Sequence, residues 1–114
     1  MDTAQLLLRL APALTMVIFG IHQWAKPSEW LHYIPAWATK SSPMKPESSM
    51  KLHALGNIAF GLFLASGWHP LLSVWVALIW WVSILPFAFR VSWAIGLRDL
   101  TITVGLVALL LLVR

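Results

Sequence analysis

The sequence predicts an all-α integral membrane protein: a four-helix up-down bundle with a short interfacial helix or re-entrant piece between its first two helices. Hydrophobic residues make up 60% of the chain and charged residues only 11%, against about 25% charged residues in an average soluble domain. Four stretches also reach the roughly 20 residues that a helix needs to cross bilayer hydrocarbon. We treat residues 1–114 as a single domain.

The expected spans cover residues 4–24, 49–68, 70–89 and 94–113. In the first span, Pro12 is tolerated if a neighbouring helix or a water satisfies the carbonyl that it frees. This span differs from a signal peptide because its apolar run has full spanning length, Asp2 and Arg9 spoil a basic start, and no small-residue cleavage site follows. We therefore expect it to remain as a permanent helix.

Residues 25–48 form the link between the first two spans. Its aromatic and apolar residues recur at helical spacing, which predicts the interfacial helix or re-entrant piece in its first half. The second half, beginning at ATKSSPMKPESS, is predicted as loop. The second and third spans meet across GWHP and are therefore antiparallel. Alternation of direction then places both termini on one membrane face and the link on the other.

Basic residues concentrate on the face that carries the link. They are Lys26, Lys40, Lys45, Lys51 and Arg90, against Arg9 and Arg114 on the opposite face. The positive-inside rule therefore favours a multi-pass protein of the cell membrane with a cytoplasmic link and both termini outside. The net charge of +4 flanks apolar runs, a pattern that indicates membrane anchoring rather than a nucleic-acid partner.

Most aromatic residues outside the span interiors are expected to anchor the protein at the membrane–water interface. These anchors are Trp24, Trp30, Tyr33, Trp37, Trp68 and Trp93. Trp80 and Trp81 instead lie in the middle of the third span. They either pack against other helices or line an apolar pocket for a flat lipophilic molecule such as a quinone, with their N–H groups seeking acceptors such as Ser83.

Polar residues within spans are costly and mark candidate sites. Antiparallel threading brings several of them to the link face, where they form either a polar cluster or plain interhelical contacts. The candidate ligand-binding residues are His22, His53, Asn57, Trp80, Trp81, Arg98 and Asp99. Neighbouring positions on a helix point about 100° apart, so we expect Arg98 and Asp99 each to meet another helix rather than each other.

No metal site is predicted. The chain has no cysteine, and its histidines and carboxylates show no metal-ligand spacing on one helix. No cofactor is evident, and a quinone or lipid is the candidate ligand.

Gly61 and Ala65 form a small-xxx-small pattern that favours close approach of another helix.

A diffuse pattern of single residues runs along nearly the whole chain. It comprises Arg9, Gly20, His22, Pro27, Trp30, Pro35, Trp37, Gly61, Pro86, Arg98 and Asp99. In this pattern the chain resembles the DoxX-like family of small four-helix membrane proteins, relatives of the small subunit of archaeal thiosulfate:quinone oxidoreductase. The resemblance implies association with a redox enzyme or a larger membrane complex. The chain departs from it at Asn57, where many relatives carry a glutamate, and at Phe87–Phe89, where they carry an asparagine.

Three functions follow as hypotheses. The first is an accessory or anchoring subunit of a membrane-bound redox complex, not catalytic by itself, with a lipid- or quinone-facing pocket. The second is a quinone-linked oxidoreductase subunit, in which His22 and His53 relay protons while Arg98 stabilises a quinol anion or an anionic donor such as thiosulfate. The third is a small-solute carrier, disfavoured because inverted repeats are absent. The expected partners are the bilayer and other membrane subunits or a second copy of the chain.

Overall fold

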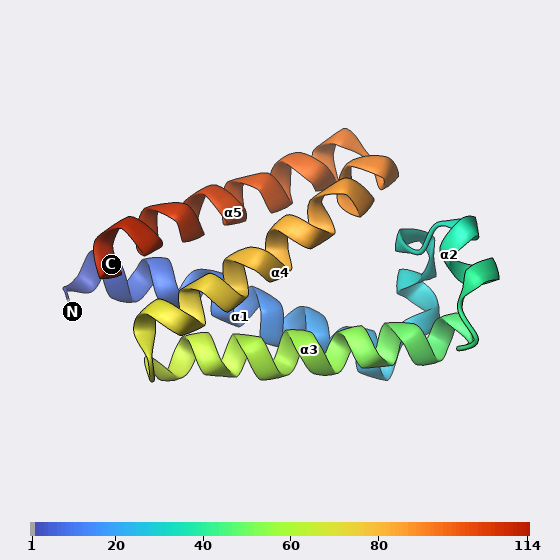
Figure 1. Ribbon diagram of the computed structural model, residues 1–114, viewed down its shortest axis with the longest axis horizontal. Coiled ribbons are helices and arrows are strands. Elements are labelled where there is room, and N and C mark those ends of the chain that lie inside the picture. The colour runs from blue at the N-terminus through green and yellow to red at the C-terminus, as the bar shows by residue number, and fades with distance from the viewer. Residues whose placement is uncertain (1) are drawn as a thin grey trace.

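The computed structural model describes residues 2–114, and all of the regular structure in that range is helical. The elements are α1 (Thr3–Ala25), the 3-10 helix η1 (Pro27–Tyr33), α2 (Ala36–Ser41), α3 (Pro46–Ser66), α4 (Pro70–Val91) and α5 (Trp93–Val113). The prediction of an all-α fold is confirmed. Figure 1 shows that successive long helices run in opposite directions and that the N and C ends lie together, far from α2.

Three helices within residues 2–114 are long and apolar enough to cross a membrane: α1, α4 and α5. They support the expectation of a membrane protein. α3 is also 21 residues long, but it opens on the polar sequence PESSMK. Its start at Pro46 precedes the expected residue 49 because proline suits a first helical turn and Glu47 there complements the helix dipole. All the other long-helix ends lie within two residues of the expected ones.

α1 packs most extensively against α3, and α4 against α5. Glycines bring the first pair together. A Cβ atom at Gly20 would lie 2.8 Å from the carbonyl oxygen of Ala54, and one at Gly61 would lie 3.0 Å from the carbonyl oxygen of Ala13. The close approach expected at the Gly61 pattern is therefore confirmed, and α1 is the helix that makes it.

The α3–α4 corner joins the two helix pairs. Gly67 ends α3 in the left-handed region at φ 72°, His69 follows at φ 46°, and Pro70 opens α4. From this corner α4 rises away from α3, so that the two helices form a V whose open end faces the link (Figure 1). Buried side chains from all four long helices fill the interior, among them Met16, Leu64, Trp81 and Leu106.

The link is more helical than the sequence predicted. Its first half is helical as expected, as η1. Helix α2 then occupies residues that we assigned partly to loop, because Pro35 starts a new turn and the backbone N–H groups of Ala38 and Thr39 both donate to its carbonyl. Arg90 at the end of α4 donates from Nη2 to the carbonyl of His32 at 2.8 Å. This hydrogen bond fastens the link to the α4–α5 pair.

Candidate functional site

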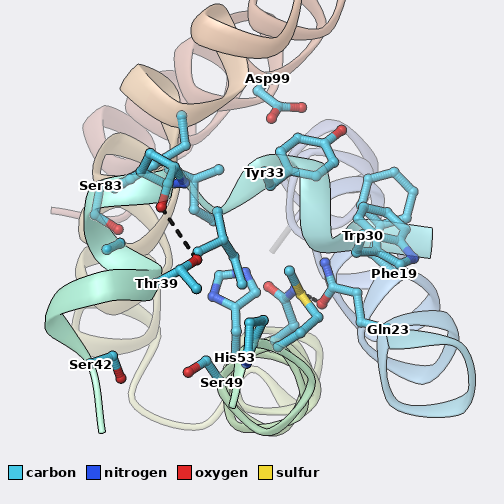
Figure 2. Close-up of a pocket in the computed structure, with 18 of the residues that line it drawn as sticks. Phe19, Gln23, Trp30, Tyr33, Thr39, Ser42, Ser49, His53, Ser83 and Asp99 are labelled. Atoms are coloured by element: carbon cyan, nitrogen blue, oxygen red, sulfur yellow. Dashed lines mark hydrogen bonds between the residues drawn. The ribbon is translucent and has the colours of Figure 1, made fainter. Parts of the chain in front are cut away.

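A pocket of about 480 Å³ lies at the link end of the molecule, lined by residues of α1, η1, α2, α3, α4 and α5. Pockets that hold small molecules have this order of size and combine apolar walls with a few placed polar groups. Figure 2 shows Gln23 entering from α1, Trp30 and Tyr33 from η1, His53 from α3 and Asp99 from α5. The pocket therefore lies where both helix pairs and the link meet.

A chain of hydrogen bonds forms part of one wall of this pocket. The indole N–H of Trp80 donates to Oδ1 of Asn57 at 2.7 Å, and Nδ2 of Asn57 donates to Oε1 of Gln23 at 2.8 Å. Asn57 and Gln23 are each only 4% exposed. Buried amides are stable when paired in this way. The two hydrogen bonds therefore fix the rotation of α3 relative to both α1 and α4.

Trp80 supports the pocket from behind rather than lining it. Its ring stacks on His53, with the ring centroids 4.8 Å apart and the ring planes at 17°. Gly56 leaves room for the indole, since a side chain there would collide with it. The expectation that Ser83 accepts an indole hydrogen bond is wrong, because the N–H of Trp80 donates to Asn57 and the N–H of Trp81 has no hydrogen-bond partner among residues 2–114.

His53 points from α3 into the pocket (Figure 2). Its ring stacks on Trp80. Neither of its ring nitrogens forms a hydrogen bond with another residue of the described range. Trp81 also lines the pocket, and its indole N–H is buried without a hydrogen-bond partner among residues 2–114. These two rings are polar groups that the fold itself leaves unsatisfied.

Arg98 and Asp99 line the pocket and, contrary to expectation, pair with each other. Nε of Arg98 lies 2.9 Å from Oδ1 of Asp99. The helical offset between the two positions is bridged because the long arginine side chain folds back. The Arg98 guanidinium also lies over the ring of Phe19 in α1, 5.1 Å from its centroid. Asp99 is 2% exposed, so its carboxylate depends on this neighbour.

His22 does not join the predicted cluster. Its Nδ1 accepts a 2.7 Å hydrogen bond from the indole N–H of Trp30, and its Nε2 lies 3.2 Å from a carboxylate oxygen of Glu29. Both partners belong to η1, so His22 fastens the link to the end of α1. The sequence predicted that His22 lies at this end of the molecule. It did not predict that η1 would pass close enough to bind it.

The predicted interface anchors divide into two groups. The indoles of Trp24, Trp37, Trp68 and Trp93 are exposed. Trp30 and Tyr33 instead line the pocket and stack on each other, with ring centroids 5.5 Å apart. They contribute an aromatic wall to the site.

Sequence reasoning missed Gln23, which lines the pocket and is buried. A signal was present. Met16, Gly20 and Gln23 follow one another at the spacing of a single helix face, and all three are buried. An amide continuing a buried apolar face needs a partner on another helix, and in this fold the partner is Asn57.

Trp80→Phe is expected to lower the free energy of unfolding by roughly 1 to 2 kcal/mol, because it leaves buried Oδ1 of Asn57 without a donor. Thermal unfolding in detergent measures the loss. Trp75→Phe is the matched control, since Trp75 is exposed and its change should stay within about 0.5 kcal/mol. Equal losses in the two variants would show that the indole hydrogen bond contributes nothing.

Among residues 2–114, no group of three histidine, aspartate or glutamate side chains is arranged to hold a metal ion. In comparisons with protein-family models, curated proteins and solved structures, the chain matched none.

Proposed function

We propose that this protein is an accessory subunit of a membrane-bound redox complex and that it holds a quinone, or a lipid of similar shape, in the pocket beneath the link. The observation that carries the proposal is the pocket itself: about 480 Å³, with aromatic and apolar walls and a small set of polar groups. Sites for lipophilic ligands combine these properties.

The aromatic walls suit a flat ring. Phe19, Trp30, Tyr33 and Trp81 all contribute to the lining, and aromatic rings favour offset or edge-to-face contact with another π-system. The polar groups of Gln23, His53 and Asp99 enter from three different helices. A ring with polar substituents would find hydrogen-bond partners there, while an isoprenoid or acyl tail would extend into lipid.

The composition of the chain supports the accessory role. It has no cysteine, so any thiol chemistry that changes the oxidation state of a quinone would come from a partner. The DoxX-like pattern of the sequence supports the same assignment, because it implies a place in a redox complex.

For the membrane arrangement, we propose that α3 crosses the bilayer with α1, α4 and α5, as an up-down four-helix bundle. α3 packs along α1, and Leu52, Leu55 and Leu62 on it are exposed, which suits contact with lipid. η1 and α2 would lie at the interface on the cytoplasmic side, with both termini outside. Because the chain lacks cysteine, single cysteines introduced at Ser42 and at Thr3 can be labelled in intact cells with a thiol reagent that does not cross the membrane. The cysteine at Thr3 should be labelled from outside, and the cysteine at Ser42 should not.

Thr39→Phe tests the pocket. Thr39 lies on α2 and points into the pocket (Figure 2), so a phenyl ring there would fill space that a ligand needs. We expect wild-type protein purified in mild detergent to retain quinone or a selected lipid, and Thr39→Phe to retain at least about tenfold less, as chromatography of the organic extract would show. Thr101→Phe, at an exposed position outside this pocket, should retain the wild-type amount. Equal retention by both variants would contradict the proposal.

A second experiment tests the accessory role. Affinity purification in mild detergent should recover the chain with a stoichiometric redox partner. His53, whose ring nitrogens have no hydrogen-bond partner among the described residues, favours the quinone-linked oxidoreductase subunit as the second candidate. That candidate would replace the first if the chain purified alone and reduced a quinone at the expense of an added electron donor such as thiosulfate, with His53→Gln lowering turnover while leaving the protein folded.

A further inference from the structure

We infer that Gln23 is the residue that recognises the ligand, by donating a hydrogen bond from its amide nitrogen to a carbonyl oxygen of a neutral molecule. This inference rests on the proposed function, because it names the chemical group that the pocket would bind. It depends on three properties of the site: the orientation of the amide, its burial and the charge balance around it.

The hydrogen bond that Trp80 donates determines, through Asn57, how the amide of Gln23 is oriented. An indole N–H can only donate, so Asn57 must turn its oxygen toward Trp80, which it does at 2.7 Å. The nitrogen of Asn57 then faces Gln23 and donates to its oxygen at 2.8 Å. Gln23 is left with its amide nitrogen, which is a donor only. The hydrogen-bond chain therefore holds the oxygen of Gln23 against Asn57 and leaves its amide nitrogen to offer N–H groups to the pocket.

The amide nitrogen of Gln23 lacks a partner within the protein. The side chain is 4% exposed and lines the pocket, and no residue of the range 2–114 accepts a hydrogen bond from this nitrogen. In Figure 2 the nitrogen points away from α3, toward the upper part of the pocket where Tyr33 lies. This nitrogen is not among the fully buried unpaired atoms of residues 2–114, so it is accessible from the pocket, and a ligand oxygen there can accept a hydrogen bond from it.

The charge balance favours a neutral ligand. Among residues 2–114, Arg98 is the single lysine or arginine residue that lines the pocket. Its Nε already pairs with Asp99 at 2.9 Å. The Arg98–Asp99 pair carries no net charge, so an anion bound to the remaining guanidinium N–H groups would add an uncompensated negative charge beside a carboxylate that is 2% exposed. A carbonyl compound avoids this conflict, whereas an anionic donor such as thiosulfate does not.

Two probes separate recognition of the carbonyl from burial of the tail. 2-Decyl-1,4-naphthoquinone and 2-decylnaphthalene share a fused ring and an alkyl chain, but only the first carries carbonyl oxygens. We expect calorimetry on the full chain in nanodiscs to show tighter binding of the naphthoquinone. Gln23→Met keeps the length of the side chain and removes the whole amide, both the donor and the oxygen that accepts from Asn57, and it should weaken naphthoquinone binding about tenfold while leaving decylnaphthalene binding unchanged. Gln5→Met, outside the pocket, is the matched control.

The outcomes distinguish this inference from the proposed function. If wild-type protein binds neither probe, the proposed function fails. If it binds the naphthoquinone but Gln23→Met has no effect, or weakens both probes equally, the pocket stands and recognition by Gln23 is overturned. If Gln23→Met does not fold, infrared spectra of carbonyl-labelled naphthoquinone on wild-type protein decide. A carbonyl band shifted to lower frequency than in protein-free nanodiscs supports the hydrogen bond, and an unshifted band overturns it.

Discussion

Replacing Arg98 with methionine should lower the free energy of unfolding by on the order of 3 kcal/mol, because it leaves the buried carboxylate of Asp99 without the half-buried guanidinium that pairs with it. Asp99 is 2% exposed, and Arg98 lies 2.9 Å from its carboxylate. Without the guanidinium, Asp99 must either remain charged among apolar groups or take up a proton in order to fold. Chemical unfolding in mixed micelles, followed by circular dichroism, measures the change.

The control is a double-mutant cycle. Asp99→Leu removes the buried charge, so the variant carrying both Arg98→Met and Asp99→Leu should recover most of the stability that Arg98→Met loses. Arg114→Met, at the exposed C-terminal end, should behave like wild type. If the losses of the two single variants simply add in the double variant, the two side chains do not stabilise each other and our account of the pair is wrong.

Gly20→Leu should cost at least about 3 kcal/mol of stability, at or above the usual range for overpacked sites. A Cβ atom there would lie 2.7 Å from Cγ1 of Ile58 and 2.8 Å from the carbonyl oxygen of Ala54. Ile58 could change rotamer, but a backbone oxygen can move only if α3 moves with it. We therefore expect α1 and α3 to separate, with a lower melting temperature and aggregation on size-exclusion chromatography.

Gly105→Leu is the matched control for this substitution. Among residues 2–114, no atom beyond the adjoining turns of its own helix lies within 4 Å of a Cβ atom built at Gly105, and glycine is a poor helix former by about 1 kcal/mol relative to alanine. The control should be neutral or slightly more stable than wild type. Equal destabilisation at both glycines would show that leucine disturbs these helices for a reason other than the α1–α3 contact.

Much of the helix layout could be predicted from the sequence, because bilayer thickness limits the length of each apolar run and strong local signals end it. Gly67 and Pro70, for example, mark the α3–α4 corner in both sequence and structure. Because α3 begins with polar residues, the apolar pattern of the sequence did not reveal its first turn. Helix α2 was missed in part because a helix of six residues leaves too few positions for a periodic pattern to be recognised.

Five of the seven candidate ligand-binding residues line the pocket: His53, Asn57, Trp81, Arg98 and Asp99. Antiparallel threading was enough to place them at one end of the molecule. Side-chain partners were harder to predict, because they depend on how each helix is rotated and on how a long side chain folds. The pairing of Arg98 with its neighbour and the amide contact of Gln23 both arise at that level, which helical periodicity does not describe.

The left-handed corner at Gly67 and His69 gives the molecule a mechanical property. α3 and α4, with 21 and 22 residues, act as lever arms about 30 Å long at 1.5 Å per residue. A rotation of about 5° at the corner would therefore move their far ends apart by about 3 Å, a distance comparable with the thickness of one aromatic ring. With α3 and α4 in the bilayer as we propose, lateral pressure in the surrounding lipid would act on those arms, and the tension of the bilayer would help to set the width of the pocket.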